Sequence, residues 1–113
     1  METFLKNRSF QIDFVLKYKD TGAAINLALL DEITIEVKHS LTKAILFTKT
    51  LTGTDVDITT AASGMCSIYI NPSDTVNATA GVYEYVATIE YEDLNFDDDD
   101  SNPAGYGNCF ILK

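Results

Sequence analysis

Residues 81–91 read Gly-Val-Tyr-Glu-Tyr-Val-Ala-Thr-Ile-Glu-Tyr and form the longest regular alternation in the chain. Aromatic and aliphatic side chains occupy every second position, namely Tyr83, Tyr85, Ala87, Ile89 and Tyr91. A period of two is typical of a β-strand that buries one face and exposes the other. This stretch therefore predicts a long strand against a hydrophobic core.

Shorter stretches with strand-like patterns lie on the N- and C-terminal sides of it. Their ranges are 8–18, 25–27, 33–39, 44–51, 56–58, 65–70 and 108–112. Because lysines flank its apolar part, the segment 44–51 is expected near a sheet edge. The spacing of turns predicts about seven or eight strands in a two-sheet antiparallel β-sandwich, with a β-barrel as the alternative. The chain 1–113 is expected to be a single all-β domain, with one short helical turn near 73–79 that follows the proline.

The composition excludes several classes of function. A net charge of -9 opposes binding to the phosphates of DNA or RNA. No apolar run is long enough to span a bilayer, and the first residues do not resemble a secretion signal. Cys66 and Cys109 are too few for a disulfide framework, so both are expected to be free, buried thiols in a reducing compartment.

The residues that could carry catalysis are sparse. His39 is the only histidine and is expected to be a surface or strand-end residue, without a nucleophile motif beside it. The carboxylate pairs at 31–32 and at 55 and 57 lie in turn-like segments. We therefore expect neither an enzyme nor a cofactor.

An acidic loop is expected over residues 92–107, and it includes four consecutive aspartates at 97–100. Asp93, Asp97 and Asp99 are weak candidates for a calcium site, because carboxylate oxygens suit Ca²⁺. Adjacent aspartates seldom converge on one ion, and the alternate ligand spacing of a calcium loop is missing. A solvated acidic loop without a metal is the favoured interpretation.

Six tyrosines and no tryptophan leave two interpretations. Tyrosines can be half-buried strand residues whose hydroxyls reach the surface. Tyr69 and Tyr106 are instead candidates for anchors of a protein interface, where tyrosine is enriched.

One turn is more specific than the alternation. Asp74-Thr75 is followed by Ala80-Gly81-Val82-Tyr83-Glu84-Tyr85, which resembles the tyrosine corner of immunoglobulin-like sandwiches. Tyr83 is the candidate for the hydroxyl that bonds back to the preceding loop, with Gly81 and Asp74 as supporting residues. The position of the second antibody cysteine holds Tyr85, which argues against an antibody-type domain.

The order of these segments resembles small virion proteins of tailed phages, including the immunoglobulin-like N-terminal domains of upper baseplate proteins. This sequence departs from that family in the length and acidity of the segment 92–107, and no receptor-binding segment follows Lys113. It implies a non-enzymatic structural protein of the tail, baseplate, neck or capsid, made in the bacterial cytoplasm and located in the virion. Its partners would be other virion proteins and copies of itself.

Two other functions remain as alternatives. The first is a carbohydrate- or cell-surface-binding sandwich with exposed tyrosines, and the second is a small enzyme that uses one of the carboxylate pairs.

Overall fold

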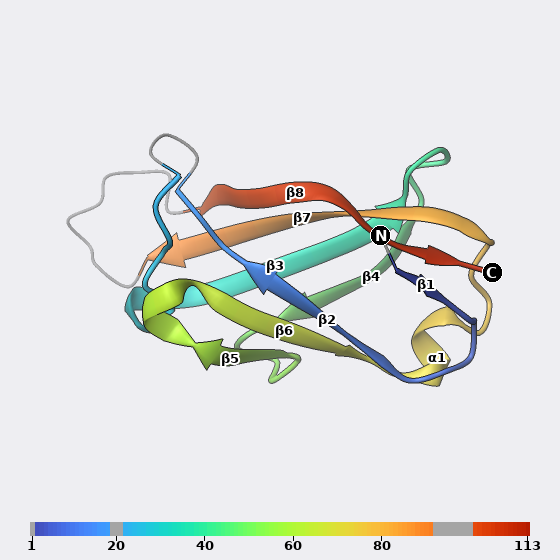
Figure 1. The fold of residues 1–113 in the computed structure, drawn as a ribbon, viewed down its shortest axis with the longest axis horizontal. Coiled ribbons are helices and arrows are strands. Elements are labelled where there is room, and N and C mark those ends of the chain that lie inside the picture. The colour runs from blue at the N-terminus through green and yellow to red at the C-terminus, as the bar shows by residue number, and fades with distance from the viewer. Residues whose placement is uncertain (1, 19–21, 92–100) are drawn as a thin grey trace.

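The computed structural model describes residues 2–18, 22–91 and 101–113, and of Tyr91 and residues 101–106 it describes the backbone alone. Eight strands form two facing sheets (Figure 1). The strands are β1 (Thr3–Phe4), β2 (Phe10–Val15), β3 (Leu30–His39), β4 (Ile45–Thr50), β5 (Val56–Thr60), β6 (Met65–Ile70), β7 (Gly81–Tyr91) and β8 (Ser101–Leu112). The described helices are the 3-10 turns Leu27–Leu29 and Ala61–Ser63 and the α-helix α1 (Pro72–Thr75).

The larger sheet has the strand order β1-β8-β7-β3-β4, and the smaller sheet has the order β2-β6-β5. The predicted all-β sandwich is therefore confirmed, and β4 is an edge strand as expected. The prediction of wholly antiparallel pairing is wrong at one place, because β1 runs parallel to the end of β8. Strands so far apart in sequence need no hairpin between them, so either direction of pairing is sterically open.

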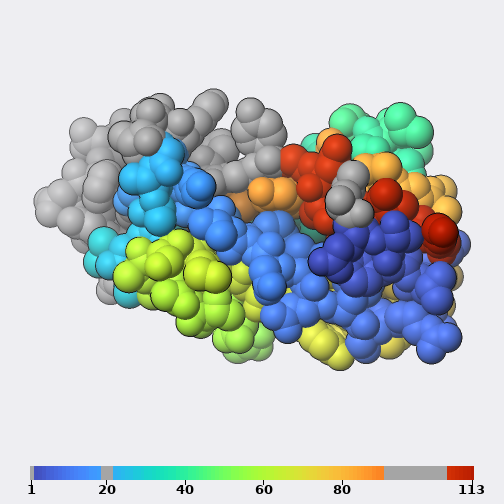
Figure 2. All heavy atoms as spheres, viewed as in Figure 1, coloured from blue at the N-terminus to red at the C-terminus, as the bar shows by residue number. Residues whose placement is uncertain are grey.

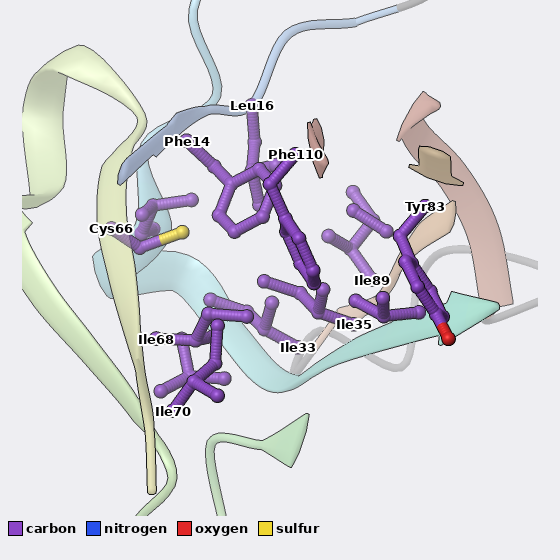
Figure 3. Packing of buried hydrophobic residues seen from close by; sticks show 14 of the residues in the cluster. Phe14, Leu16, Ile33, Ile35, Cys66, Ile68, Ile70, Tyr83, Ile89 and Phe110 are labelled. Carbon is purple, nitrogen blue, oxygen red and sulfur yellow. The ribbon is translucent and has the colours of Figure 1, made fainter. Parts of the chain in front are cut away.

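The register between β3 and β7 decides which side chains are buried. Ile33 pairs with Ile89, and Ile35 pairs with Ala87, so all four side chains point to the same face. That face lies opposite the inward side chains of the smaller sheet. Figure 3 shows three of these, Cys66, Ile68 and Ile70 of β6. The two alternating patterns thus meet in one core.

Aromatic rings extend this core to the edge where β1 joins. Phe4 stacks on Phe10 with ring centroids 4.0 Å apart, and Phe10 meets Phe110 edge to face at 5.3 Å. Phe110 in turn stacks on Tyr83 at 5.4 Å. Because such pairs stabilise beyond their buried area, the short strand β1 is held by its ring as well as by its backbone.

The helical turn is shorter than predicted and begins earlier. The α-helix spans Pro72–Thr75, in place of the expected turn near 73–79. Asn71 is the N-cap, and its backbone N–H donates to a carboxylate oxygen of Asp74 at 2.8 Å. Proline is favoured at the first helical position because its missing N–H would have no partner there. Proline therefore starts this helix instead of only ending the preceding strand.

The predicted loop 92–107 is wrong in its second part. Residues from Ser101 onward belong to β8 and pair in register with β7, for example Ser101 with Glu90 and Gly107 with Tyr85. Pro103 is compatible with a strand here because β1 pairs only with Ile111 and Leu112 on the other side of β8. At Pro103 the strand is thus a sheet edge in the described part of the chain, and edges tolerate proline.

Candidate functional site

Several side chains with specific hydrogen bonds, and one shielded ion pair, gather at one end of the sandwich, which we call the corner end. It comprises the β3–β4 hairpin at residues 39–45, α1, the segment 76–80 and the start of β7. Figure 1 shows that the two marked chain ends also lie toward this end of the molecule.

Tyr83 ties β7 to the segment before it. Its hydroxyl donates a 2.7 Å hydrogen bond to the carbonyl oxygen of Thr79, four residues upstream. The ring is buried, and burial raises the pKa of the hydroxyl, which keeps it protonated as a donor. The bond therefore fixes the path of the chain into β7.

His39 ends β3 as expected, but it is buried rather than on the surface, with an exposed fraction of 6%. Its Nδ1 accepts the backbone N–H of Leu41 at 3.2 Å, and its Nε2 lies 3.2 Å from the carbonyl oxygen of Ala80. This pattern assigns the proton to Nε2, which can then donate to Ala80. The ring also meets Tyr83 edge to face at 5.1 Å. His39 is thus a structural link between the hairpin and the start of β7.

Gly81 lets the chain pass close to this histidine. Its φ of +139° is rarely adopted by other residues, and a Cβ there would lie 2.7 Å from Nε2 of His39. Glycine is therefore required at this position both for its backbone conformation and because a larger residue would clash with His39.

Asp74 and Lys49 form a shielded ion pair that sequence analysis missed. Lys49 Nζ lies 2.8 Å from Oδ2 of Asp74, and the lysine has an exposed fraction of only 7%. Lys49 pairs with Ile35 across the strands and so shares its inward face, where it lies 5.2 Å from the Phe47 ring centroid. Lys49 follows Phe47 by two residues in β4, so the two side chains lie on the same face of the strand. This spacing is the feature of the sequence that indicates burial of the lysine. The pair joins the edge strand β4 to α1.

A hollow of about 140 Å³ opens between the hairpin and the segment that follows α1. His39 and Tyr83 contribute to its lining, together with Thr42, Ala44, Ile45, Leu46, Asn77, Ala78 and Thr79. The polar atoms of the two rings already have partners. Both rings are therefore already engaged in contacts within the chain.

A second hollow, of about 380 Å³, lies where the N-terminal segment and β2 meet β8. Figure 2 shows these three segments side by side on one face of the molecule. Glu2, Gln11, Ile12, Asp13 and Cys109 line it. Burial raises the pKa of Cys109 to about 12, so the thiol is not a nucleophile at neutral pH.

Cys66 behaves in the same way. Both thiols are free, as expected, although Cys109 is half-buried while Cys66 is fully buried. Burial, with a smaller contribution from Asp13, raises the pKa of Cys66 to about 11.

The other predicted site residues do not converge. Tyr69 lies on the outer face of β6 opposite Gln11, with an exposed fraction of 53%. Asp93, Asp97 and Asp99 lie outside the described residues, as does the side chain of Tyr106. In residues 2–18, 22–91 and 101–113, no group of three or more His, Cys, Asp or Glu side chains is placed to hold a metal ion.

A scan against protein-family models finds no match for this chain, and a search of curated proteins finds none either. Among the helices that the structure describes, none has the length and apolar character needed to cross a membrane.

Proposed function

We propose that this protein is a non-enzymatic structural component of a tailed-phage particle, built on an immunoglobulin-like sandwich and working through contacts with copies of itself and a neighbouring virion protein. The strand order is the observation that carries the proposal. In immunoglobulin-like sandwiches, the second, fifth and fourth strands share one sheet, and the seventh, sixth and third share the other. With β4 counted as an additional strand beside β3, the orders β2-β6-β5 and β8-β7-β3-β4 fit this scheme.

The bond between Tyr83 and Thr79 adds independent support. A tyrosine corner has a tyrosine near the start of the penultimate strand, with its hydroxyl bonded to backbone a few residues upstream. Tyr83 is the third residue of β7, and β7 is the penultimate strand. The phage context comes from the resemblance of the segment order alone, and the proposal therefore includes location in the virion after synthesis in the bacterial cytoplasm.

Protein contacts in such a fold would use sheet edges and exposed apolar side chains. The outer edge of β4 has no strand beside it in the described part of the chain, and strand addition to such an edge is a common mode of recognition. Several large apolar side chains are exposed, including Leu41 and Ile45 at the corner end. Repetition of these contacts by symmetry would supply affinity.

The test is the composition of particles. A phage genome that encodes this chain is propagated, the particles are purified by density gradient, and their proteins are quantified by mass spectrometry. We expect the chain in a fixed ratio to the major virion proteins, while an abundant cytoplasmic host protein serves as the control that should be lost. Absence of the chain from intact particles would refute the proposal.

A carbohydrate-binding module is the second candidate, and the exposed ring of Tyr69 favours it. Its neighbour Gln11 presents an amide that donates to Asp13 at 3.0 Å, so polar groups and an aromatic face lie together. Binding on a glycan array that is lost in Tyr69→Ala, but kept in Tyr18→Ala, would support this function. A blank array would leave the assembly function as the stronger candidate.

A further inference from the structure

Three large apolar side chains are exposed at the corner end, in the β3–β4 hairpin, at the start of β4 and after α1. Leu41 lies in the β3–β4 hairpin and is 85% exposed, and Ile45 at the start of β4 is 61% exposed. Val76, directly after α1, is 49% exposed. Hairpin turns favour Gly, Asn, Asp and Ser, so neither the turn nor the core explains a leucine at this position.

One of these side chains lines the hollow of about 140 Å³, and the other two belong to residues beside its lining. Ile45 lines it, while Leu41 and Val76 directly adjoin the lining residues Thr42 and Asn77 in the chain. The hollow and its apolar rim together form a concave surface, and such surfaces are suited to the apolar side chains of a partner.

The charges around this surface are mainly positive. Five of the eight basic residues lie in the corner end or in the elements that flank it. Lys43 is in the hairpin and Lys38 directly precedes it, Lys6 and Arg8 are in the β1–β2 connection, and Lys113 follows β8. The β1–β2 connection that carries Lys6 and Arg8 reaches α1, because the N–H of Asn7 donates to Thr75.

The acidic side chains close to the hollow are already engaged. Glu84 accepts from Lys43 at 2.8 Å, which lowers the pKa of its carboxyl, and Asp74 is paired with Lys49. Glu2, beside β8, is the other acidic residue of these segments. Together the corner end and the elements that flank it hold six basic side chains, the five named above and Lys49, against the three acidic side chains Glu2, Asp74 and Glu84. This local excess of three positive charges on a protein of net charge -9 favours an acidic partner.

The opposite end of the same two strands is acidic. Glu32 of β3 stands directly opposite Glu90 of β7, and like charges in such a pair are unfavourable. Partial burial opposes ionisation of Glu32, but hydrogen bonds from Thr52 and Ile33 outweigh it and lower its pKa, so it stays charged.

The sequence continues this acidic character past the end of β7. Residues 92–100 read Glu-Asp-Leu-Asn-Phe-Asp-Asp-Asp-Asp, with six acidic residues, no basic residue and two large apolar ones. Among described residues at this end, Lys17 is the basic one. The chain thus offers, in one segment, the acidic and apolar side chains that the corner end is suited to bind.

A copy of the chain cannot fill its own hollow with this segment. Residues 92–100 start after Tyr91 and return at Ser101, which is close to β7 because it pairs with Glu90. Nine residues that return to their starting point extend at most about 16 Å, half of their contour length. The eleven residues of β7 separate this point from the corner end by roughly 33 Å.

We propose that copies of this chain associate head to tail, with the acidic end of one copy, through residues 92–100, docked on the corner-end hollow of the next. The contact is heterologous, so it produces open chains unless its rotation closes a ring. It deepens the proposed assembly function, on which it rests, by naming the surface and the occupant.

Sedimentation velocity of the purified chain over a wide concentration range, at low and high salt, tests this proposal. We expect oligomers that grow with concentration and weaken as salt rises, because salt screens the complementary charges. Leu41→Glu introduces a repelling charge at an exposed position and should raise the dissociation constant by roughly tenfold or more. The matched control is Val15→Glu, which adds the same charge at an exposed apolar position on β2 and should leave association nearly unchanged.

A mixing experiment tests whether the contact joins two different surfaces, one from each copy. Leu41→Glu retains an intact acidic end, whereas a second variant, with Asp97, Asp98, Asp99 and Asp100 changed to serine, retains an intact corner end. Each variant alone should remain monomeric, and their mixture should stop at a one-to-one complex. Melting followed by circular dichroism confirms that both variants fold.

Three outcomes would overturn the head-to-tail contact. They are a wild-type chain that stays monomeric throughout, a Leu41→Glu variant that associates like the wild type, and variants that fail to pair with each other. Oligomers that are insensitive to these changes would still be compatible with the proposed function, whereas absence of the chain from particles would remove that function whatever the sedimentation result.

Discussion

Removal of the Asp74 carboxylate should destabilise the protein strongly, because it leaves the ammonium of Lys49 in a place that water hardly reaches. Oδ2 of Asp74 accepts both from Lys49 Nζ and from the N–H of Asn71, each at 2.8 Å. The side chains of Lys49 and Asp74 are only 8% and 20% exposed. Loss of one partner from a buried pair costs about 3–5 kcal/mol, and the partial exposure of Asp74 places this case near 3 kcal/mol.

A double-mutant cycle of Asp74→Ala, Lys49→Met and the double variant separates this effect from simple loss of contacts. Asp74→Ala should cost about 3 kcal/mol, while Lys49→Met/Asp74→Ala should cost only about 1 kcal/mol, because methionine keeps the apolar stem without the charge. The free energy of unfolding is measured in urea with tyrosine fluorescence, since the chain has six tyrosines and no tryptophan.

A second ion pair among the described residues is the matched control. Lys43 and Glu84 are also 2.8 Å apart, but the lysine side chain is 61% exposed. Glu84→Ala should therefore leave the unfolding midpoint nearly unchanged, because exposed pairs contribute little. A double variant as unstable as Asp74→Ala alone, or an Asp74→Ala variant that loses less than about 1 kcal/mol, would contradict the reasoning.

Three further predictions concern the corner end and the thiols. Tyr83→Phe should lower the free energy of unfolding by about 1 kcal/mol through loss of the bond to Thr79, and an unchanged urea midpoint would argue against a stabilising role for that bond. Gly81→Ala should cost more than about 1 kcal/mol, because the added Cβ meets His39 and the backbone is left-handed; a variant as stable as the wild type would show that the chain relaxes there. The free energy of unfolding should fall as the pH rises from 9 to about 11, because the unfolded chain forms thiolates freely while burial keeps Cys66 protonated in the folded state. The Cys66→Ala variant should lose less stability than the wild type over the same pH range. Equal losses in the two proteins would show that other groups cause the fall.

The fold could be predicted from the sequence where alternation is strict. Alternate residues from Tyr83 to Ile89 are apolar or aromatic, and the structure buries Tyr83, Ala87 and Ile89 fully and Tyr85 partly. The prediction of secondary structure failed where pairing with a distant strand, and not the local pattern, makes a segment a strand. Ser101 to Gly107 contains proline and glycine and is typical of a loop, yet the register with β7 makes it a strand.

The candidate site could be predicted only in part. Tyr83 was identified because the turn before it has a local sequence signature, and its hydroxyl bonds back to that turn. The partnership of Lys49 with Asp74 joins residues 25 positions apart and depends on how α1 docks on β4, which no local pattern encodes. The burial of His39 likewise depends on Gly81, which approaches it from another strand.

The parallel pairing of β1 with β8 has a practical consequence for protein engineering. The carbonyl of Glu2 accepts from the N–H of Ile111 at 3.0 Å, and that of Phe4 accepts from Lys113 at 3.1 Å, so the two ends of the described chain run side by side in the same direction. A circular permutant is therefore feasible if its linker is long enough to turn back along β1, with new ends opened in the turn between β4 and β5. An affinity tag on either end of the described chain would emerge close to the corner end, whereas a tag in the turn between β4 and β5 would lie beside Glu32, at the opposite end of β3.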